Sequence, residues 1–179
     1  MNDQGFSLEP FPQASPPPSF KITGNIARRS NTLFIRYALP GHLAELVIPA
    51  PVGMPARKKG LWEGTCFEFF LALRNSHQYW EFNLSPAGHW NVYRFSDYRQ
   101  GMEEEMAFTS LPFHVEHQSD SLRLALELDL NPIVQADQSL EVAISAVIKI
   151  RDGDVTYWAL THRGSRADFH RRNSFIVEL

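Results

Sequence analysis

Hydrophobic and polar residues alternate along most of the chain with a period of two, which is the pattern of β-strands. The clearest run has a leucine at every second position from Leu122 to Leu130, with mostly polar residues between them. A second run, from Val142 to Ile150, repeats the pattern with aliphatic residues. Each run predicts a strand with one face in the core. Further strands are predicted at 20–29, 32–39, 43–48, 65–73, 78–84, 89–96, 112–118, 155–160 and 174–179.

Turn-forming residues separate these runs, as at Pro40-Gly41 and Arg151–Asp154. No helical stripe is longer than about two turns, and one short helix is expected at 98–106. About ten short strands with frequent turns and no crossover helices are typical of antiparallel sheets packed face to face. The sequence therefore predicts an all-β fold: an antiparallel two-sheet β-sandwich, immunoglobulin- or jelly-roll-like, with at most one short helix.

The first part of the chain, residues 1–19, differs in composition from the rest. Its prolines are Pro10, Pro12, Pro16, Pro17 and Pro18. Prolines disfavour regular strand pairing and favour an extended path, whereas Phe6, Leu8 and Phe11 are apolar enough to dock on the domain surface. We therefore expect a partly docked, proline-rich N-terminal extension over 1–19 and a β-sandwich domain over 20–179.

Charge and cysteine content narrow the classes of partner. The 179 residues carry 17 Lys and Arg against 20 Asp and Glu, a net charge of −3. Nucleic-acid-binding domains usually show a basic excess and anionic membranes attract basic clusters, so neither partner is expected. The single cysteine, Cys66, excludes an intrachain disulfide and favours a reducing compartment. No apolar stretch approaches a membrane span and no basic signal-peptide region is present, so we expect a cytoplasmic protein.

The stretch from Tyr79 to Phe95 reads as two strands joined by a tight turn at Ser85–Gly88. If the loop has an even number of residues, the more polar face carries Tyr79, Glu81, Asn83, Trp90, Val92 and Arg94. The more apolar face, which should meet the core, then carries Trp80, Phe82, Leu84, His89, Asn91, Tyr93 and Phe95. The polar face is either solvated, with a surface ion pair between Glu81 and Arg94, or a platform for a sugar.

A sugar platform needs an aromatic face for the C–H patch of the ring and planar polar groups for its hydroxyls. Trp62 and Glu68, upstream of the hairpin, extend this candidate set. Glu68 shares a strand face with Cys66 and Phe70 and needs a partner or a ligand, because an unpaired buried charge is costly. Trp62 lies in the preceding loop, either as an exposed stacking residue or as a plug. Glu68 and Glu81 are also the residue types of a glycosidase pair, although nothing in the sequence sets their separation.

Metal and catalytic motifs are weak or absent. His162, Asp168 and His170 have side chains that suit zinc or iron, but their spacing matches no strong metal motif, which favours hydrogen-bonding anchors. The sequence contains no Gly-rich phosphate loop, Cys-x-x-Cys, His-Glu-x-x-His or Gly-x-Ser-x-Gly. We therefore expect no enzymatic activity.

Several spaced motifs together resemble a known family. They are Leu61-Trp62-Glu63-x-Thr65-Cys66-Phe67-Glu68-x-Phe70, Glu81-Phe82-Asn83-x-Ser85-Pro86-x-Gly88-x-Trp90, Tyr157-Trp158-Ala159-Leu160-x-His162 and Asp168-Phe169-His170. In this order the chain is similar, over about residues 20–179, to the bacterial DOMON-like proteins. That group is related to dopamine β-monooxygenase N-terminal domains, cytochrome-type haem domains and family-nine carbohydrate-binding modules.

The resemblance implies a two-sheet sandwich that binds a sugar or haem and catalyses no reaction. Haem-binding relatives use a methionine and a histidine as axial ligands. The candidates here are Met54, Met102 and Met106 with His42, His89, His162 or His170, and no pair of them matches the haem-binding pattern.

These observations together predict a non-catalytic module that binds a small carbohydrate or glycoconjugate and needs no cofactor. The expected contact residues are Trp62, Glu68, Glu81, Asn83, Trp90 and Arg94. The alternatives are a haem-binding redox domain and a scaffold for a protein partner, and Ca²⁺ is a further candidate ligand.

Overall fold

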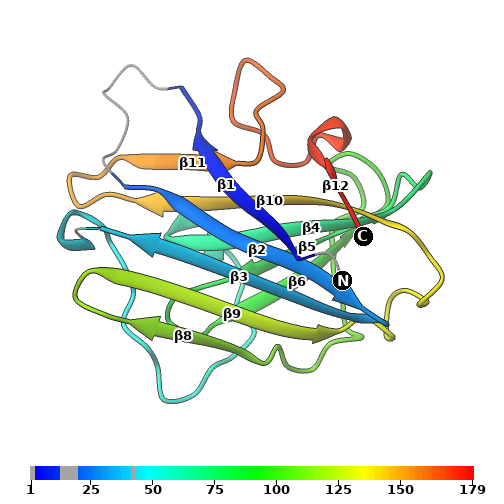
Figure 1. Cartoon of the computed structure of the whole chain (residues 1–179), viewed down its shortest axis with the longest axis horizontal. Coiled ribbons are helices and arrows are strands. Elements are labelled where there is room, and N and C mark those ends of the chain that lie inside the picture. Colours follow the sequence, from blue (N-terminus) through cyan, green and yellow to red (C-terminus); the bar gives the residue numbers. More distant parts are fainter. Residues whose placement is uncertain (1–2, 13–19, 42) are drawn as a thin grey trace.

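The computed structural model describes residues 3–12, 20–41 and 43–179, and nearly all of its regular structure is β-strand (Figure 1). Within these ranges the strands are β1 (Gln4–Pro10), β2 (Ile22–Arg29), β3 (Thr32–Pro40), β4 (Cys66–Leu73), β5 (Tyr79–Leu84), β6 (Trp90–Phe95), β7 (Glu103–Glu104), β8 (Phe113–His117), β9 (Ser121–Asp129), β10 (Leu140–Lys149), β11 (Val155–Ala159) and β12 (Val177–Glu178). The 3₁₀-helices are η1 (Leu43–Glu45), η2 (Leu61–Glu63) and η3 (Arg172–Ser174). None of the helices in the described ranges has the length and apolar character that a membrane crossing requires.

The strands form one antiparallel sheet in the order β7-β6-β5-β4-β10-β11-β1-β2-β3-β9-β8, with β12 beside β10. The sheet curls so that β2, β3 and β9 lie in front of β4, β5 and β6 (Figure 1). The facing side chains of both layers make one hydrophobic cluster. Tyr37 on β3 packs its ring 5.1 Å from that of Phe67 on β4 and donates a hydrogen bond to the backbone oxygen of Glu68 at 2.7 Å.

The all-β antiparallel prediction is confirmed, but two separate sheets are not. Strand β1 pairs with β2 on one side and with β11 on the other, so the two layers are continuous through it. The prediction that prolines block pairing over 1–19 is therefore wrong for Gln4–Pro10, because the first proline comes only at the end of the strand. Residues 13–19, with the remaining proline run, lie outside the described ranges.

A glycine anchors this N-terminal strand. Gly24 on β2 is paired with Phe6 on β1, and the Phe6 ring lies over the position where a side chain of residue 24 would be. A Cβ at Gly24 would collide with the Phe6 ring and with the Arg36 carbonyl oxygen. Phe6 also packs edge-on against Tyr37, with ring centroids 5.6 Å apart. The docking of β1 thus depends on a glycine that leaves room for an aromatic ring.

The alternation pattern located most strands, because burial along them follows the expected period of two. On β9 every leucine from Leu122 to Leu128 is buried and the residues between them are more exposed. Two predictions are wrong. Residues 43–48 form η1 and a single bridge at Leu46 rather than a strand. Residues 98–106 form turns and β7 rather than a helix, since Arg99 and Gly101 have left-handed φ angles of 52° and 63°.

Candidate functional site

The loop that joins β5 and β6 has an odd number of residues, whereas the face assignment made from the sequence assumed an even number. Leu84 pairs with Trp90 across the hairpin, so Ser85–His89 form the connection. The Gly88 N–H donates to the Ser85 oxygen at 2.9 Å, the Ser85 N–H donates to the His89 oxygen at 2.8 Å, and φ of Gly88 is 99°. This is the pattern of a type I turn followed by a G1 bulge, an odd-numbered loop. The condition of an even loop is therefore not met, and the face that carries Glu81 comprises Tyr79, Glu81, Asn83, Asn91, Tyr93 and Phe95.

Trp90 and Arg94 consequently lie on the other face. Trp90 is buried in the core cluster, where the Arg57 guanidinium lies 4.5 Å from the centre of its ring. Arg94 is exposed and donates to Glu103 at 2.8 Å, so the predicted ion pair with Glu81 is wrong as well. Neither residue reaches the face that carries Glu81 and Asn83, and the indole expected beside that carboxylate belongs to the core.

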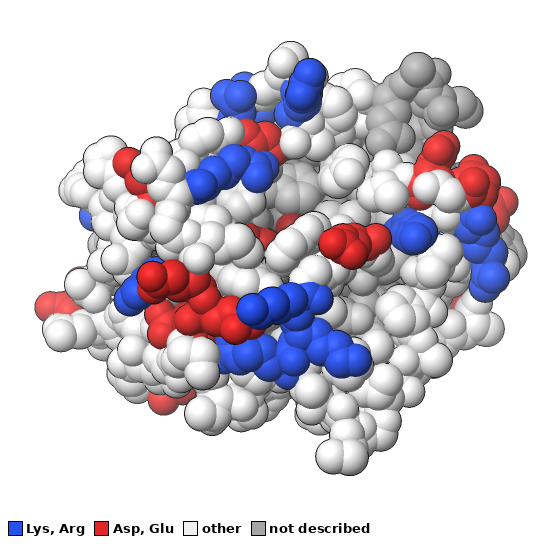
Figure 2. All heavy atoms as spheres, turned by 180° about the vertical axis from the view of Figure 1, so that it is seen from behind, with Lys and Arg blue, Asp and Glu red and all other residues white. Residues whose placement is uncertain are grey.

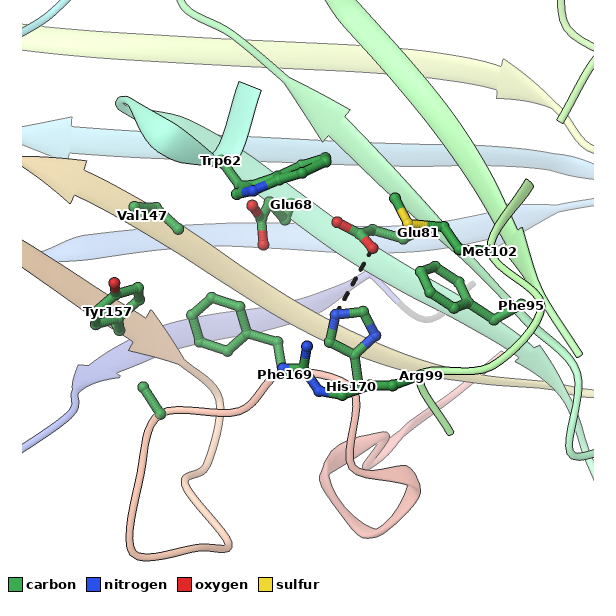
Figure 3. Close-up of a pocket in the computed structure, with 11 residues that line it drawn as sticks. Trp62, Glu68, Glu81, Phe95, Arg99, Met102, Val147, Tyr157, Phe169 and His170 are labelled. Atoms are coloured by element: carbon green, nitrogen blue, oxygen red, sulfur yellow. Dashed lines mark ion pairs between the residues drawn. The ribbon is translucent and has the colours of Figure 1, made fainter. Parts of the chain in front are cut away.

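The Glu81 face is covered by the segment that follows β11, which forms a second hydrophobic cluster with it. The cover leaves a cavity of about 360 Å³. Figure 2 shows this side of the molecule, with acidic atoms visible in a hollow near its centre. The lining residues are Trp62, Glu68, Glu81, Phe95, Arg99, Met102, Val147, Tyr157, Ala167, Phe169 and His170 (Figure 3).

Glu81 lies at the centre of a polar chain in this pocket. Its Oε1 accepts a hydrogen bond from Asn83 Nδ2 at 3.0 Å, and its Oε2 lies 3.8 Å from His170 Nε2. His170 Nδ1 is 2.8 Å from the Tyr79 hydroxyl, which also accepts from the Arg99 backbone N–H at 3.1 Å. The Tyr79 proton is therefore best directed at His170 Nδ1. This leaves the imidazole proton on Nε2, facing Glu81.

The imidazole is neutral near pH 7. Burial, followed by the positive charge of Arg99, lowers the pKa of His170 to about 4. A cationic histidine is thus not available to keep Glu81 ionised at neutral pH. The hydrogen-bonded residues around Glu81 therefore fix the position of its carboxyl group but provide no positive charge from His170 to balance an ionised carboxylate.

Asp168 fixes the rim of the pocket. It accepts hydrogen bonds from Arg99 at 2.9 Å and from the Tyr98 hydroxyl, and Arg171 Nε lies 3.3 Å from its second oxygen. Burial raises the pKa of Asp168, but the bonds from Tyr98 and Arg99 outweigh this effect and the net pKa is lowered. The ionised Asp168 therefore holds the 96–101 turn and the C-terminal segment together over the sheet.

Glu68 is the second carboxyl group in the pocket and is 2% exposed. The Ser145 hydroxyl lies 3.4 Å from its Oε2, and its Oε1 has no hydrogen-bond partner among the described residues. Burial, reinforced by the neighbouring Glu81, raises the pKa of Glu68 well above its usual range. Burial also raises the pKa of Glu81 to about 7, against the opposing effects of Asn83 and Arg99. The floor of the pocket therefore holds two carboxyl groups whose hydrogen-bonding capacity is only partly used.

The structure brings most of the predicted contact residues together. Trp62, Glu68 and Glu81 line the pocket, and Asn83 is fully buried beneath it against Glu81. Trp62 is 38% exposed, with its ring centroid 5.7 Å from that of Tyr93, which fits an accessible stacking residue better than a plug. Figure 3 shows its indole and the Phe169 ring on opposite sides of the two carboxyl groups.

The residues that sequence reasoning missed come from loops and distant strands: Phe95, Arg99, Met102, Tyr157 and Phe169. Asp168 and His170 were weighed as weak metal-ligand candidates, with hydrogen-bonding anchors favoured, and His170 also as a haem ligand. The one available signal was the Asp168-Phe169-His170 motif, which the family resemblance singles out without giving its role.

The weak metal-ligand candidates His162, Asp168 and His170 are not brought together, and each is a hydrogen-bonding residue, as the sequence favoured. His162 Nε2 lies 2.8 Å from the Glu9 backbone oxygen, whereas Asp168 and His170 belong to the pocket. In residues 3–12, 20–41 and 43–179, no three His, Cys, Asp or Glu side chains are grouped as metal ligands. Of the haem-ligand candidates, Met102 and His170 line the pocket, and Met54 and Met106 are exposed. His89 Nδ1 accepts a bond from the Ala56 N–H, and His42 lies outside the described residues.

No protein-family model and no curated protein sequence matches this chain. Among solved structures, the chain is similar to a candidate carbohydrate-binding protein from Bacteroides uniformis, with a TM-score of 0.70 and 13% identity, over 96% of this chain and 84% of that one. It is also similar to a family 9 carbohydrate-binding module from Caldicellulosiruptor kristjanssonii in complex with glucose, with a TM-score of 0.54 and 11% identity, over 92% and 78% of the two chains. These similarities establish that the chain shares its fold with these two proteins. The resemblance to DOMON-like proteins stays a prediction.

Proposed function

We propose that the protein is a non-catalytic module that binds a small sugar, or the sugar part of a glycoconjugate, in the pocket between Trp62 and Phe169. The observation that carries this proposal is one cavity that combines aromatic walls with two buried carboxyl groups. The two similar solved structures described above carry names that refer to carbohydrate binding. They support the same class of ligand here.

The geometry suits a polyol. A cavity of about 360 Å³ falls in the lower range of small-molecule pockets, which favours a mono- or disaccharide over a polymer. The Trp62 indole offers a stacking face to the C–H patch of a sugar ring. Hydroxyl groups both donate and accept, so they suit the carboxyl groups of Glu68 and Glu81 in either protonation state. The aromatic walls would supply affinity and the carboxyl groups would fix orientation.

Catalysis is disfavoured by the state of the two carboxyl groups. A glycosidase needs one carboxylate ionised opposite one that is protonated. The pKa values of Glu68 and Glu81 are both raised by burial, and the lining guanidinium of Arg99 is bonded to Asp168. At Glu81 the hydrogen bond from Asn83 and the charge of Arg99 offset burial only in part, so neither carboxyl group is held fully ionised near pH 7. Incubation with aryl glycosides is expected to release no chromophore.

Haem is a second candidate because Met102 and His170 line the same cavity. The residues present fit it poorly. His170 is bonded through Nδ1 to Tyr79 and turns Nε2 toward Glu81, and the two carboxyl groups would have to face an apolar macrocycle. We expect no Soret band in the purified protein and none after haemin is added; a stoichiometric band would favour haem over a sugar.

A thermal-shift screen tests the proposal, because a ligand that binds the folded state raises the melting temperature. The panel contains mono- and disaccharides, nucleotide sugars and Ca²⁺. The best sugar is then titrated by calorimetry into wild type, Trp62→Ala and the control Phe34→Ala. Phe34 is a half-buried aromatic residue on β3, in the other layer. If no sugar shifts the wild type, the proposal fails and a protein partner becomes the preferred ligand.

The exposure of Trp62 sets the expected effect. An aromatic side chain buries up to about 250 Å², so 38% exposure leaves about 95 Å² to be covered. At about 25 cal/mol per Å², complete covering is worth about 2.4 kcal/mol and half of it about 1.2 kcal/mol. Trp62→Ala should therefore weaken binding by a factor between about 8 and about 50. Phe34→Ala should leave the affinity unchanged, and an equal loss in both variants would remove Trp62 from the site.

A further inference from the structure

The two carboxyl groups in the pocket have more acceptor capacity than the protein fills. Glu68 is 2% exposed, and its Oε1 has no hydrogen-bond partner among the described residues. Glu81 Oε2 lies 3.8 Å from His170 Nε2, which is too far for a hydrogen bond. Both oxygens belong to residues that line the same cavity. A ligand that fills the cavity is therefore met by two acceptors that need donors.

Among the described residues that line the cavity, no free cation faces these carboxyl groups. Arg99 lines the pocket, but its guanidinium is bonded to Asp168, and so is that of Arg171. His170 is the other basic group that lines the cavity, and it is neutral near pH 7 because burial lowers its pKa to about 4. Positive charge at the floor of the pocket would thus have to come from the ligand.

We propose that the pocket selects a sugar bearing a protonated amine, whose ammonium group lies between Glu68 and Glu81; this inference rests on the proposed function. An ammonium group has three donors and no acceptor, which matches acceptors that lack donors. Aromatic faces attract cations, and the rings of Trp62, Phe95 and Phe169 line the cavity. A neutral hydroxyl group fills the same space but brings neither the charge nor the surplus of donors.

Binding of a cation couples to the protons of the pocket. Burial raises the pKa of Glu81 to about 7 and that of Glu68 well above its usual range. An ammonium beside them favours the ionised carboxylates, so the complex should release a proton. The titratable and charged groups that face the pair are Cys66, Tyr79, Tyr93, Arg99 and His170, with Asp168 behind Arg99 and Tyr37 behind Glu68.

The test compares matched sugars by calorimetry on the whole protein at about pH 6, where the amine of a 2-amino sugar is protonated. Glucose, glucosamine and N-acetylglucosamine differ only at one ring position. Because hydrogen bonds to charged groups are the stronger ones, glucosamine should bind about tenfold tighter than either neutral sugar. Titrations in two buffers of different ionisation enthalpy should show release of about one proton with glucosamine and none with glucose.

Variants assign the effect to the carboxyl groups. In Glu81→Gln, glucosamine and glucose should bind with about equal affinity. Glu127 is exposed on β9, so Glu127→Gln should keep the preference for glucosamine over glucose at about tenfold. The wild-type proton count keeps the test decisive if Glu81→Gln does not fold. Equal affinities for glucose and glucosamine would overturn the amine inference and leave the proposed function standing. Binding of none of the three sugars would count against both, and ethylammonium binding as tightly as glucosamine would overturn the role of the sugar ring.

Discussion

The buried Glu81 should make the stability of the protein depend on pH in a direction opposite to that of most carboxylates. Its pKa moves from an ordinary 4.5 to about 7 in the folded state, chiefly because of burial. Between these values the unfolded chain has lost the proton and the folded chain still holds it, so stability falls as the pH rises. At 1.36 kcal/mol for each pH unit, the interval from 4.5 to about 7 corresponds to about 3 kcal/mol.

Glu81→Gln isolates this contribution. Glutamine keeps the side-chain oxygen that accepts from Asn83 and removes the ionisation. We expect the variant and the wild type to be about equally stable near pH 4 and the variant to be more stable by about 3 kcal/mol near pH 9. Removing the Glu81 charge also lowers the pKa of Glu68, which adds to the difference in the same direction.

Urea denaturation at about six pH values between about 4 and 9 measures the difference, since the free energy of unfolding extrapolates linearly. His170 opposes the effect, because its lowered pKa makes the fold lose stability as the pH falls from 6.5 toward about 4. That contribution is present in both proteins and cancels in the comparison. Glu127→Gln on the exposed side of β9 serves as the matched control and should give no pH-dependent difference. Parallel curves for wild type and Glu81→Gln would refute the burial argument.

Other substitutions probe the fold and the corrected register. Gly24→Ala should destabilise the protein by about 3 kcal/mol or more in thermal unfolding, because its Cβ collides with backbone and an aromatic ring. Gly5→Ala should be tolerated, because its Cβ would make only an ordinary contact with the Gly24 backbone oxygen at 3.9 Å. Trp90→Ala should lose about 3–5 kcal/mol in urea denaturation, as expected for a buried aromatic residue. Arg94→Ala should lose at most about 1 kcal/mol because its ion pair is exposed, and sugar titration should show unchanged affinity.

Local alternation was enough to predict most of the strands, because a strand with one face in the core shows its period directly. This holds for β9, whose leucines are buried in turn. It fails where pairing depends on residues far apart in the chain. Strand β1 joins the two layers because Phe6 fits over Gly24, and no local sequence pattern predicts this contact between residues far apart in the chain.

The pocket was harder to predict than the fold because it is assembled from segments between Trp62 and His170. The sequence placed Glu81 and Asn83 on one face correctly, since they lie two apart on one strand. It could not place Arg99, whose position depends on left-handed backbone in a turn, or Phe169, which belongs to the covering segment. Trp90 was assigned to the wrong face by one residue of loop length.

That one-residue error has a physical cause that bears on function. Hydrophobic character normally decides which face of a hairpin meets the core, but both faces of β5 are buried and so, apart from Arg94, are both faces of β6. One face packs in the core through Phe82 and Trp90, and the other packs under the C-terminal segment through Tyr79 and Phe95. Where both faces are covered, the alternation of polar and apolar residues no longer indicates which face meets the core, and the length of the turn sets the pairing register. In the structure the Ser85–Gly88 turn, with proline second and Gly88 in the left-handed region, closes an odd loop. A polar residue on a doubly buried hairpin is costly unless it is hydrogen-bonded. Asn83 satisfies Glu81 Oε1, but Oε2 lies 3.8 Å from His170 Nε2, beyond hydrogen-bond distance, so the covered face and not the exposed edge is the place to test for a ligand.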